Sequence, residues 1–308
     1  MASTEQEFQK QLKACCDMAA TYLDELKSSD RVVEDKTFSS IDFHDKMCKL
    51  GKVLAHDATK LTLACKPPRK PGDAQRMVQE MSDSVYRLVG FYHGVPQSGY
   101  QAFKASYTTT IRQLLLGVQS LCSTFMDKDE HKVEFMVPTA ALWETCKTLQ
   151  NDMPATNHAA AVASWKQMRE TLSDVKEEVH DHGIDDDDED EEEEEPKKEQ
   201  VESEVQKQCA KLVDVAVLVF QKIERRCLAD AANDNEWCDR LWKSGKELAD
   251  ETDVLVSQLY EEDQPVDIPA FIKKLLDLIA IAQERASGDH AKWFEMCAQK
   301  VSEMQETK

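Results

Sequence analysis

His44 and Cys48 stand four residues apart, a spacing that places an imidazole and a thiol on one face of a helix. Side chains of these two kinds bind zinc, but a structural zinc site needs four ligands, and the sequence offers no second pair at a comparable spacing. His180 and His182 adjoin an acidic segment whose carboxylates could hold a divalent cation loosely, yet nothing there fixes a coordination geometry. We therefore interpret His44 and Cys48 as neighbours on a buried helix face, and we expect no metal or other cofactor.

Motifs that mark enzymes are missing from the sequence. It contains no glycine-rich phosphate loop, no zinc-protease helix motif, no pair of CxxC motifs and no nucleophile elbow. Its many carboxylates form no recognisable acid–base pair. We therefore expect that the protein is not an enzyme and has no catalytic residues.

An unbroken acidic run is the most unusual segment of the chain. It consists of Asp185, Asp186, Asp187, Asp188, Glu189, Asp190, Glu191, Glu192, Glu193, Glu194 and Glu195. The run carries about half of the net charge of −21 and has no apolar residue to bury, so we expect it to stay solvated and disordered. It could bind a basic partner, such as a histone tail or the basic region of a transcription factor, or it could be a repelling spacer that improves solubility. We keep the whole run as candidate partner-binding residues.

Leucines recur every seven residues at Leu241, Leu248 and Leu255, with Leu259 one turn further on. An apolar stripe of this kind is half of a leucine-zipper pattern, so a partner helix could dock on it. The seam of an ordinary helical bundle shows the same spacing, and three leucines do not separate the two interpretations. We keep these four leucines as candidate partner-binding residues.

The composition predicts an all-α protein, because Gly and Pro number only nine each and residues that favour helices are plentiful. The net charge of −21 disfavours direct binding to nucleic acid and to anionic membranes, since both need clustered Lys and Arg. The polar N-terminus lacks the apolar core of a signal peptide, and no apolar stretch is long enough to span a bilayer. We therefore expect that the cysteines are reduced thiols.

Apolar residues at three- and four-residue steps predict about ten amphipathic helices on the two sides of the acidic run. The expected ranges are 5–28, 40–65, 73–94, 98–126, 138–149, 157–180, 200–228, 234–261, 267–286 and a last helix from 289. Helices of this length joined by short turns pack as antiparallel bundles. We therefore predict two antiparallel helical bundles, at residues 1–184 and 199–308, joined by a disordered acidic linker at 185–198.

Three blocks of the sequence carry a resemblance to a known family. They are HDATKLTLACKPP (His56 to Pro68), SVYRLVGFYHGVPQSGYQAFKASYTTTIRQLLLGVQSL (Ser84 to Leu121) and ALWETCKTLQNDMPATNHAAAVASWKQMRETLSDVKEEV (Ala141 to Val179). In this order, and followed by an acidic segment, they resemble the cyclin-D-binding protein family, also described as Id-like, helix-loop-helix-interacting proteins. The resemblance covers residues 41–180, and beyond the acidic run the chain is similar to the family only in its helical pattern.

The resemblance implies a non-enzymatic, two-bundle helical protein of the nucleus and cytoplasm. Family members bind D-type cyclins and helix-loop-helix transcription factors, and they act as negative regulators of cell-cycle progression and transcription. They lack a DNA-binding basic region, as this sequence does. We therefore expect an interaction protein that sequesters regulators of these two kinds.

Two other classes of protein fit the same residues. A structural adaptor like the helical bundles of vinculin and catenin proteins would have a similar fold, and it would co-sediment with actin without binding cyclins. An acidic chaperone for histones would lose its partner in high salt and on deletion of the acidic run.

Overall fold

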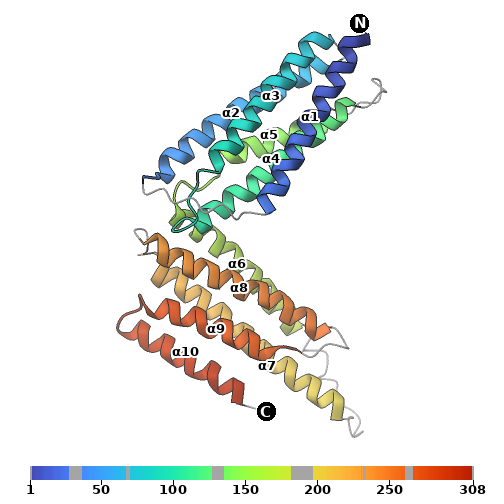
Figure 1. Cartoon of the computed structure of the whole chain (residues 1–308). Coiled ribbons are helices and arrows are strands. Elements are labelled where there is room, and N and C mark those ends of the chain that lie inside the picture. The colour runs from blue at the N-terminus through green and yellow to red at the C-terminus, as the bar shows by residue number, and fades with distance from the viewer. Residues whose placement is uncertain are drawn as a thin grey trace. The chain divides into compact units, whose positions relative to one another are not determined.

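The computed structural model describes residues 2–27, 37–66, 70–126, 135–181, 197–229, 231, 234–260 and 266–306. Within these ranges the regular elements are ten α-helices and one π-helical turn, with no strand (Figure 1). The predicted all-α fold is confirmed. No helix among the described residues is long and apolar enough to cross a membrane.

The chain divides into two compact units, Met1–Ala160 and Ala161–Lys308. The first unit holds α1 (Ala2–Lys27), α2 (Ser40–Cys65), α3 (Pro71–Tyr92), α4 (Gln101–Met126) and α5 (Met136–Asn151). The second holds most of α6 (Asn157–Asp181), followed by α7 (Lys197–Ile223), the π-helical turn η1 (Glu224–Leu228), α8 (Asn235–Tyr260), α9 (Ile268–Gln283) and α10 (Asp289–Glu306).

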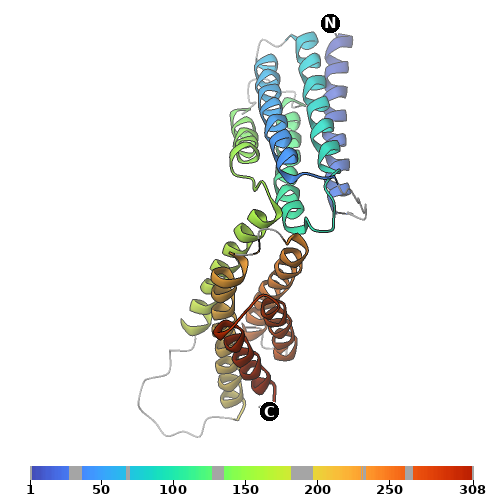
Figure 2. The ribbon, with the colours of Figure 1, turned by 90° about the vertical axis from the view of Figure 1, so that its left-hand side faces the viewer.

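The five helices of the first unit form a closed ring. Helix α1 packs against α3 and α4, α2 packs against α3 and α5, and α4 packs against α5 (Figure 2). Each helix therefore has two main neighbours, with a smaller contact between α3 and α4, and turns its apolar stripe toward a common core. This arrangement places the first helix of the chain in the N-terminal bundle, a question that its sequence leaves open.

Local sequence explains where α2 and α3 begin and end. The Ser39 hydroxyl accepts a hydrogen bond from the Asp42 backbone N–H at 3.2 Å and so caps the start of α2. This helix ends just before Pro67, which holds Lys66 in an extended conformation. Pro71 then occupies the first position of α3, where its missing N–H leaves no hydrogen bond unmade.

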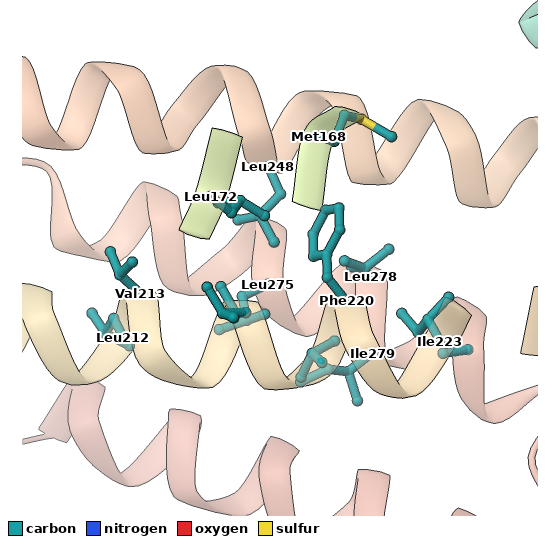
Figure 3. Close-up of a cluster of buried hydrophobic side chains, with 14 of the residues drawn as sticks. Met168, Leu172, Leu212, Val213, Phe220, Ile223, Leu248, Leu275, Leu278 and Ile279 are labelled. Carbon is teal, nitrogen blue, oxygen red and sulfur yellow. The ribbon is translucent and has the colours of Figure 1, made fainter. Parts of the chain in front are cut away.

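The core of the second unit is built around Trp165 of α6. Its indole is fully buried, stacks on Phe220 of α7 at 4.4 Å between ring centroids, and donates a hydrogen bond from Nε1 to the Phe220 carbonyl oxygen at 3.2 Å. Further along α6, Met168 and Leu172 lie in the same cluster, near Phe220 and Leu248 (Figure 3). Helix α6 is thus an integral part of the second unit.

This packing corrects the predicted domain boundary at residue 184. The prediction assigned the helix at 157–180 to the N-terminal bundle because the acidic run follows it. Its buried side chains from Trp165 to Val179 instead belong to the core of the second unit, where Trp165 contacts Phe220 of α7 and lies against Gly245 of α8. The acidic run therefore stands between two helices of one unit in chain order, and does not separate the two units.

Replacing Gly245 of α8 with alanine should destabilise the second unit by about 1–3 kcal/mol, because the core there is already full. A Cβ atom at this position would lie 2.5 Å from Cζ3 and 3.0 Å from Cη2 of Trp165, and the stacking and hydrogen bond of the indole prevent it from moving aside. Urea unfolding followed by circular dichroism measures the change. Gly90→Ala on α3 is the control: its Cβ meets nothing within 4 Å, so it should stabilise the chain by roughly 0.5–1 kcal/mol. A Gly245→Ala protein as stable as the unsubstituted chain would contradict this account of the core.

Candidate functional site

The leucine repeat lies inside the second unit. Leu241 and Leu248 are fully buried, Leu255 is 1 % exposed, and Leu259 packs at the edge of the same core. Their seven-residue spacing is therefore that of a bundle seam, which is the alternative that the sequence leaves open. Partner binding by these leucines stays a prediction, and it would require α8 to leave the bundle.

Of the other candidate residues, His44 and Cys48 are neighbours, with His44 Nε2 3.6 Å from Cys48 Sγ, but two ligands do not make a metal site. The acidic run from Asp185 to Glu195 lies outside the described residues, so its role in partner binding stays a prediction. His44 Nδ1 lies 2.9 Å from the Tyr107 hydroxyl, and Cys48 Sγ lies 3.4 Å from the Gln150 carbonyl oxygen. Among the described residues no group of three His, Cys, Asp or Glu side chains is placed to hold a metal ion.

A groove on the first unit runs along the contact between α2 and α3. It has a volume of about 330 Å³ and is lined by Lys46, Lys49, Leu50, Arg87 and Phe91. Lys46, Lys49 and Leu50 lie one turn apart on α2, and Arg87 and Phe91 lie one turn apart on α3, so each helix turns one face to the groove. We call this site the α2–α3 groove.

The floor of the α2–α3 groove is apolar and held firmly from behind. Leu50 and Phe91 are both half-buried. The Phe91 ring stacks on the buried Phe43 with centroids 5.0 Å apart and an interplanar angle of 11°. Phe43 in turn makes edge-to-face contacts with Tyr107 at 5.1 Å and Phe103 at 5.5 Å. This aromatic cluster fixes the exposed face of Phe91 as a flat apolar surface.

The walls of the groove are basic and lack carboxylate partners. Lys46, Lys49 and Arg87 are exposed, and within the described part of the chain no carboxylate oxygen lies within 4.0 Å of their charged groups. Lys46 Nζ instead lies 5.3 Å from the centroid of the Phe91 ring, a cation–π contact. The groove therefore concentrates three positive charges on a chain whose net charge is −21.

About two to three turns away from the groove along the same two helices, the charges are paired. There Lys60 of α2 lies 2.9 Å from Glu80 and 3.7 Å from the buried Asp57. Asp57 also accepts a hydrogen bond from the Ser84 hydroxyl at 2.6 Å. The charges at that end of the α2–α3 contact are thus satisfied within the protein, whereas those of the groove are open to an external ligand.

The chemistry of the groove suits a ligand that combines negative charge with an apolar group. Three cations that no carboxylate of the described residues reaches would attract the carboxylates of a ligand, and Leu50 and Phe91 offer an apolar surface between them. A volume of about 330 Å³ is at the lower end of the range for ligand pockets, which suits side chains of a docked segment.

A second depression, in the C-terminal unit, has a different character. It lies along α9 and has a volume of about 540 Å³. Its lining mixes Asp267 and Asp277 with Lys273 and contains no aromatic ring. Because its charges are of both signs and it has no aromatic anchor, we do not regard it as the main binding site.

The basic groove was not among the residues singled out from the sequence. Its signal was the helical spacing of Lys46, Lys49 and Leu50, together with that of Arg87 and Phe91. Lysines at such spacing are common on any solvated helix face. Only the packing of α2 against α3 shows that these ones border an apolar floor and that no carboxylate of the described residues lies within 4.0 Å of them.

Comparison with known proteins gives a family match that includes the helices of the α2–α3 groove. Residues 46–184 match the model of a family described as Grap2 and cyclin-D-interacting, N-terminal, which confirms the resemblance stated from the sequence. The match includes all five residues that line the α2–α3 groove. A search of curated proteins found no match to the chain.

Proposed function

We propose that this chain, whose residues 46–184 match the model of the Grap2 and cyclin-D-interacting family, is a non-enzymatic module that binds D-type cyclins. The family description supports a role in protein–protein interaction, and the α2–α3 groove lies within the matched residues. The observation that carries the proposal is the set of three cations around Phe91 with no carboxylate partner in the described part of the chain.

The α2–α3 groove would accept an acidic segment of the cyclin that carries at least one large apolar side chain. Carboxylates of the segment would pair with Lys46, Lys49 and Arg87, and the apolar side chain would cover Phe91 and Leu50. The apolar contact would supply most of the affinity, and the charge complementarity would speed encounter and select acidic partners. Phe91 is held by its stack on Phe43, so the groove needs little rearrangement to bind.

Binding of this kind would act by sequestration. A cyclin held by this protein would be withdrawn from its other partners, which makes the protein a negative regulator of cell-cycle progression. The proposal extends to helix-loop-helix transcription factors as further partners and to a location in both nucleus and cytoplasm. These additional partners and this location follow from the family resemblance, and measurements of binding and of cellular location would test them.

Lys49→Glu should weaken binding of a purified D-type cyclin about tenfold, because a repelling charge replaces an attracting one in the groove. Isothermal titration calorimetry with the whole chain measures the Kd, and the difference should shrink as salt is raised from about 0.05 to 0.5 M. Lys13→Glu is the matched control: it makes the same charge change at an exposed position of α1 outside the groove. Equal weakening by both substitutions would show that only net charge matters and would exclude the groove.

A further inference from the structure

The three cations of the α2–α3 groove come from two helices and line one small space. Lys46 and Lys49 belong to α2 and Arg87 to α3, and all three border the same volume of about 330 Å³. No carboxylate oxygen of the described residues lies within 4.0 Å of their charged groups. The described part of the chain therefore supplies no counter-charge to this site, which favours an anionic ligand from outside.

An apolar surface lies directly beside these charges. Lys46 Nζ lies 5.3 Å from the centroid of the Phe91 ring, so its ammonium group stands at the floor of the groove. The Phe91 ring is held in place by its stack on Phe43, with centroids 5.0 Å apart. An anion bound by Lys46 would therefore bring the side chain next to it in the ligand over Phe91 and Leu50.

A phosphorylated side chain matches these charges better than carboxylates do. A phosphoryl group carries about −1.5 to −2 charges at neutral pH and three acceptor oxygens, so one residue can meet all three cations. A carboxylate carries a single charge and two oxygens, and a groove at the lower end of the size range for ligand pockets has little room for several of them. The planar guanidinium of Arg87 can also donate two parallel hydrogen bonds to one phosphate.

We infer that the α2–α3 groove recognises a phosphorylated serine or threonine that stands next to a large apolar residue in a partner protein. The phosphoryl group pairs with Lys46, Lys49 and Arg87, and the apolar neighbour covers Phe91 and Leu50. This specificity rests on the proposed function and states what makes the partner segment acidic. It also makes binding conditional on a kinase, because the partner loses most of its affinity when a phosphatase removes the group.

A phospholipid bilayer also presents phosphate groups, but it suits the groove less well. The net charge of −21 repels an anionic membrane surface. Leu50 and Phe91 are half-buried at the floor of the groove, whereas a flat bilayer would contact side chains that project from the protein. A single polypeptide segment can enter the groove and reach both the cations and the floor.

Fluorescence anisotropy with the whole chain and a set of short labelled peptides tests the inference. The peptides share one sequence with a leucine after the central position, which is phosphothreonine, glutamate or threonine. The phosphopeptide should bind about tenfold more tightly than the glutamate peptide, because it offers more charge and a third acceptor oxygen. The threonine peptide should bind most weakly. Replacing the leucine of the phosphopeptide with alanine should weaken binding about tenfold, because the contact with the floor is lost.

Arg87→Lys tests the role of the guanidinium. It keeps the positive charge and removes the paired hydrogen bonds, so the Kd of the phosphopeptide should rise about tenfold. Arg112→Lys is the matched control, because Arg112 is an exposed residue of α4 outside the groove, and its Kd should not change. Equal binding of the phosphopeptide and the glutamate peptide, or an equal effect of the two substitutions, would overturn the inference.

Two further results separate this inference from its alternatives. Vesicles that contain phosphatidylinositol phosphates, bound by the whole chain but not by Lys49→Glu, would overturn it in favour of a membrane if the phosphopeptide does not bind. Failure of the phosphopeptide, while a D-type cyclin still binds and Lys49→Glu weakens that binding, would overturn the inference and leave the proposed function standing. Phosphopeptide binding without cyclin binding would support the specificity of the groove and remove the cyclin as its partner.

Discussion

Replacing Trp165 with alanine is expected to destabilise the second unit by about 3–5 kcal/mol. The indole is the largest fully buried side chain of the described residues, and it fills the space between Phe220 and Gly245. Its removal leaves a cavity at the centre of the unit and takes away the hydrogen bond donor to the Phe220 carbonyl oxygen. A loss of this size is a large part of the stability of an ordinary domain.

Urea unfolding followed by tryptophan fluorescence and circular dichroism measures this loss and also tests the domain boundary. Four of the five tryptophans lie at or after residue 165, so fluorescence reports mainly on the second unit. Trp143→Ala is the control, because this side chain of α5 is 39 % exposed and its removal should cost less than about 1 kcal/mol. A Trp165→Ala protein that loses stability in the first unit would contradict the placement of α6.

The fold could be predicted from local signals where such signals exist. The predicted range 40–65 matches α2 as observed, because Ser39 caps its start and prolines follow its end. Asp267 and Pro269 likewise begin α9, where the Asp267 side chain accepts a hydrogen bond from the Ala270 N–H at 3.1 Å. Caps and prolines act within a few residues of themselves, so the sequence alone suffices to locate them.

The sequence contains no comparable local signal for which helices pack against each other. Trp165 and Leu172 showed an apolar stripe on the helix at 157–180, but periodicity does not reveal which helix covers a stripe. The acidic run led to a wrong domain boundary, because such a change in composition usually marks a linker between domains. Here the run stands in the chain between α6 and α7, which belong to one unit. The seven-residue leucine repeat was consistent with both a partner surface and a core, and the structure places its three leucines in the core, with Leu259 at the edge.

The candidate site depended on which charges are paired, and the sequence does not show pairing. Lys60 and Lys49 look alike along α2, yet Glu80 of α3 neutralises Lys60 and no carboxylate of the described residues reaches Lys49. The aromatic support of the groove joins Phe43, Phe91 and Tyr107, which lie on three helices. Such a site exists only after the helices have packed.

Reversing all three groove charges, by Lys46→Glu, Lys49→Glu and Arg87→Glu together, is expected to weaken cyclin binding by about 3–4 kcal/mol, several hundredfold in Kd. The triple variant replaces three attractions with three repulsions beside Phe91 and abolishes the cation–π contact of Lys46. It should fold normally, because all three positions are exposed and Glu favours helices about as well as Lys and Arg. Weakening should be greatest at low ionic strength, where charges are least screened.

The Kd of a purified D-type cyclin for this triple variant tests the central claim most directly. The control is Lys10→Glu, Lys13→Glu and Arg112→Glu together, which makes the same change in net charge at exposed positions of α1 and α4 outside the groove. The account predicts a several-hundredfold rise in Kd for the groove variant and less than about a tenfold rise for the control. Cyclin binding of unchanged affinity by the groove variant, with its helices intact by circular dichroism, would contradict the account.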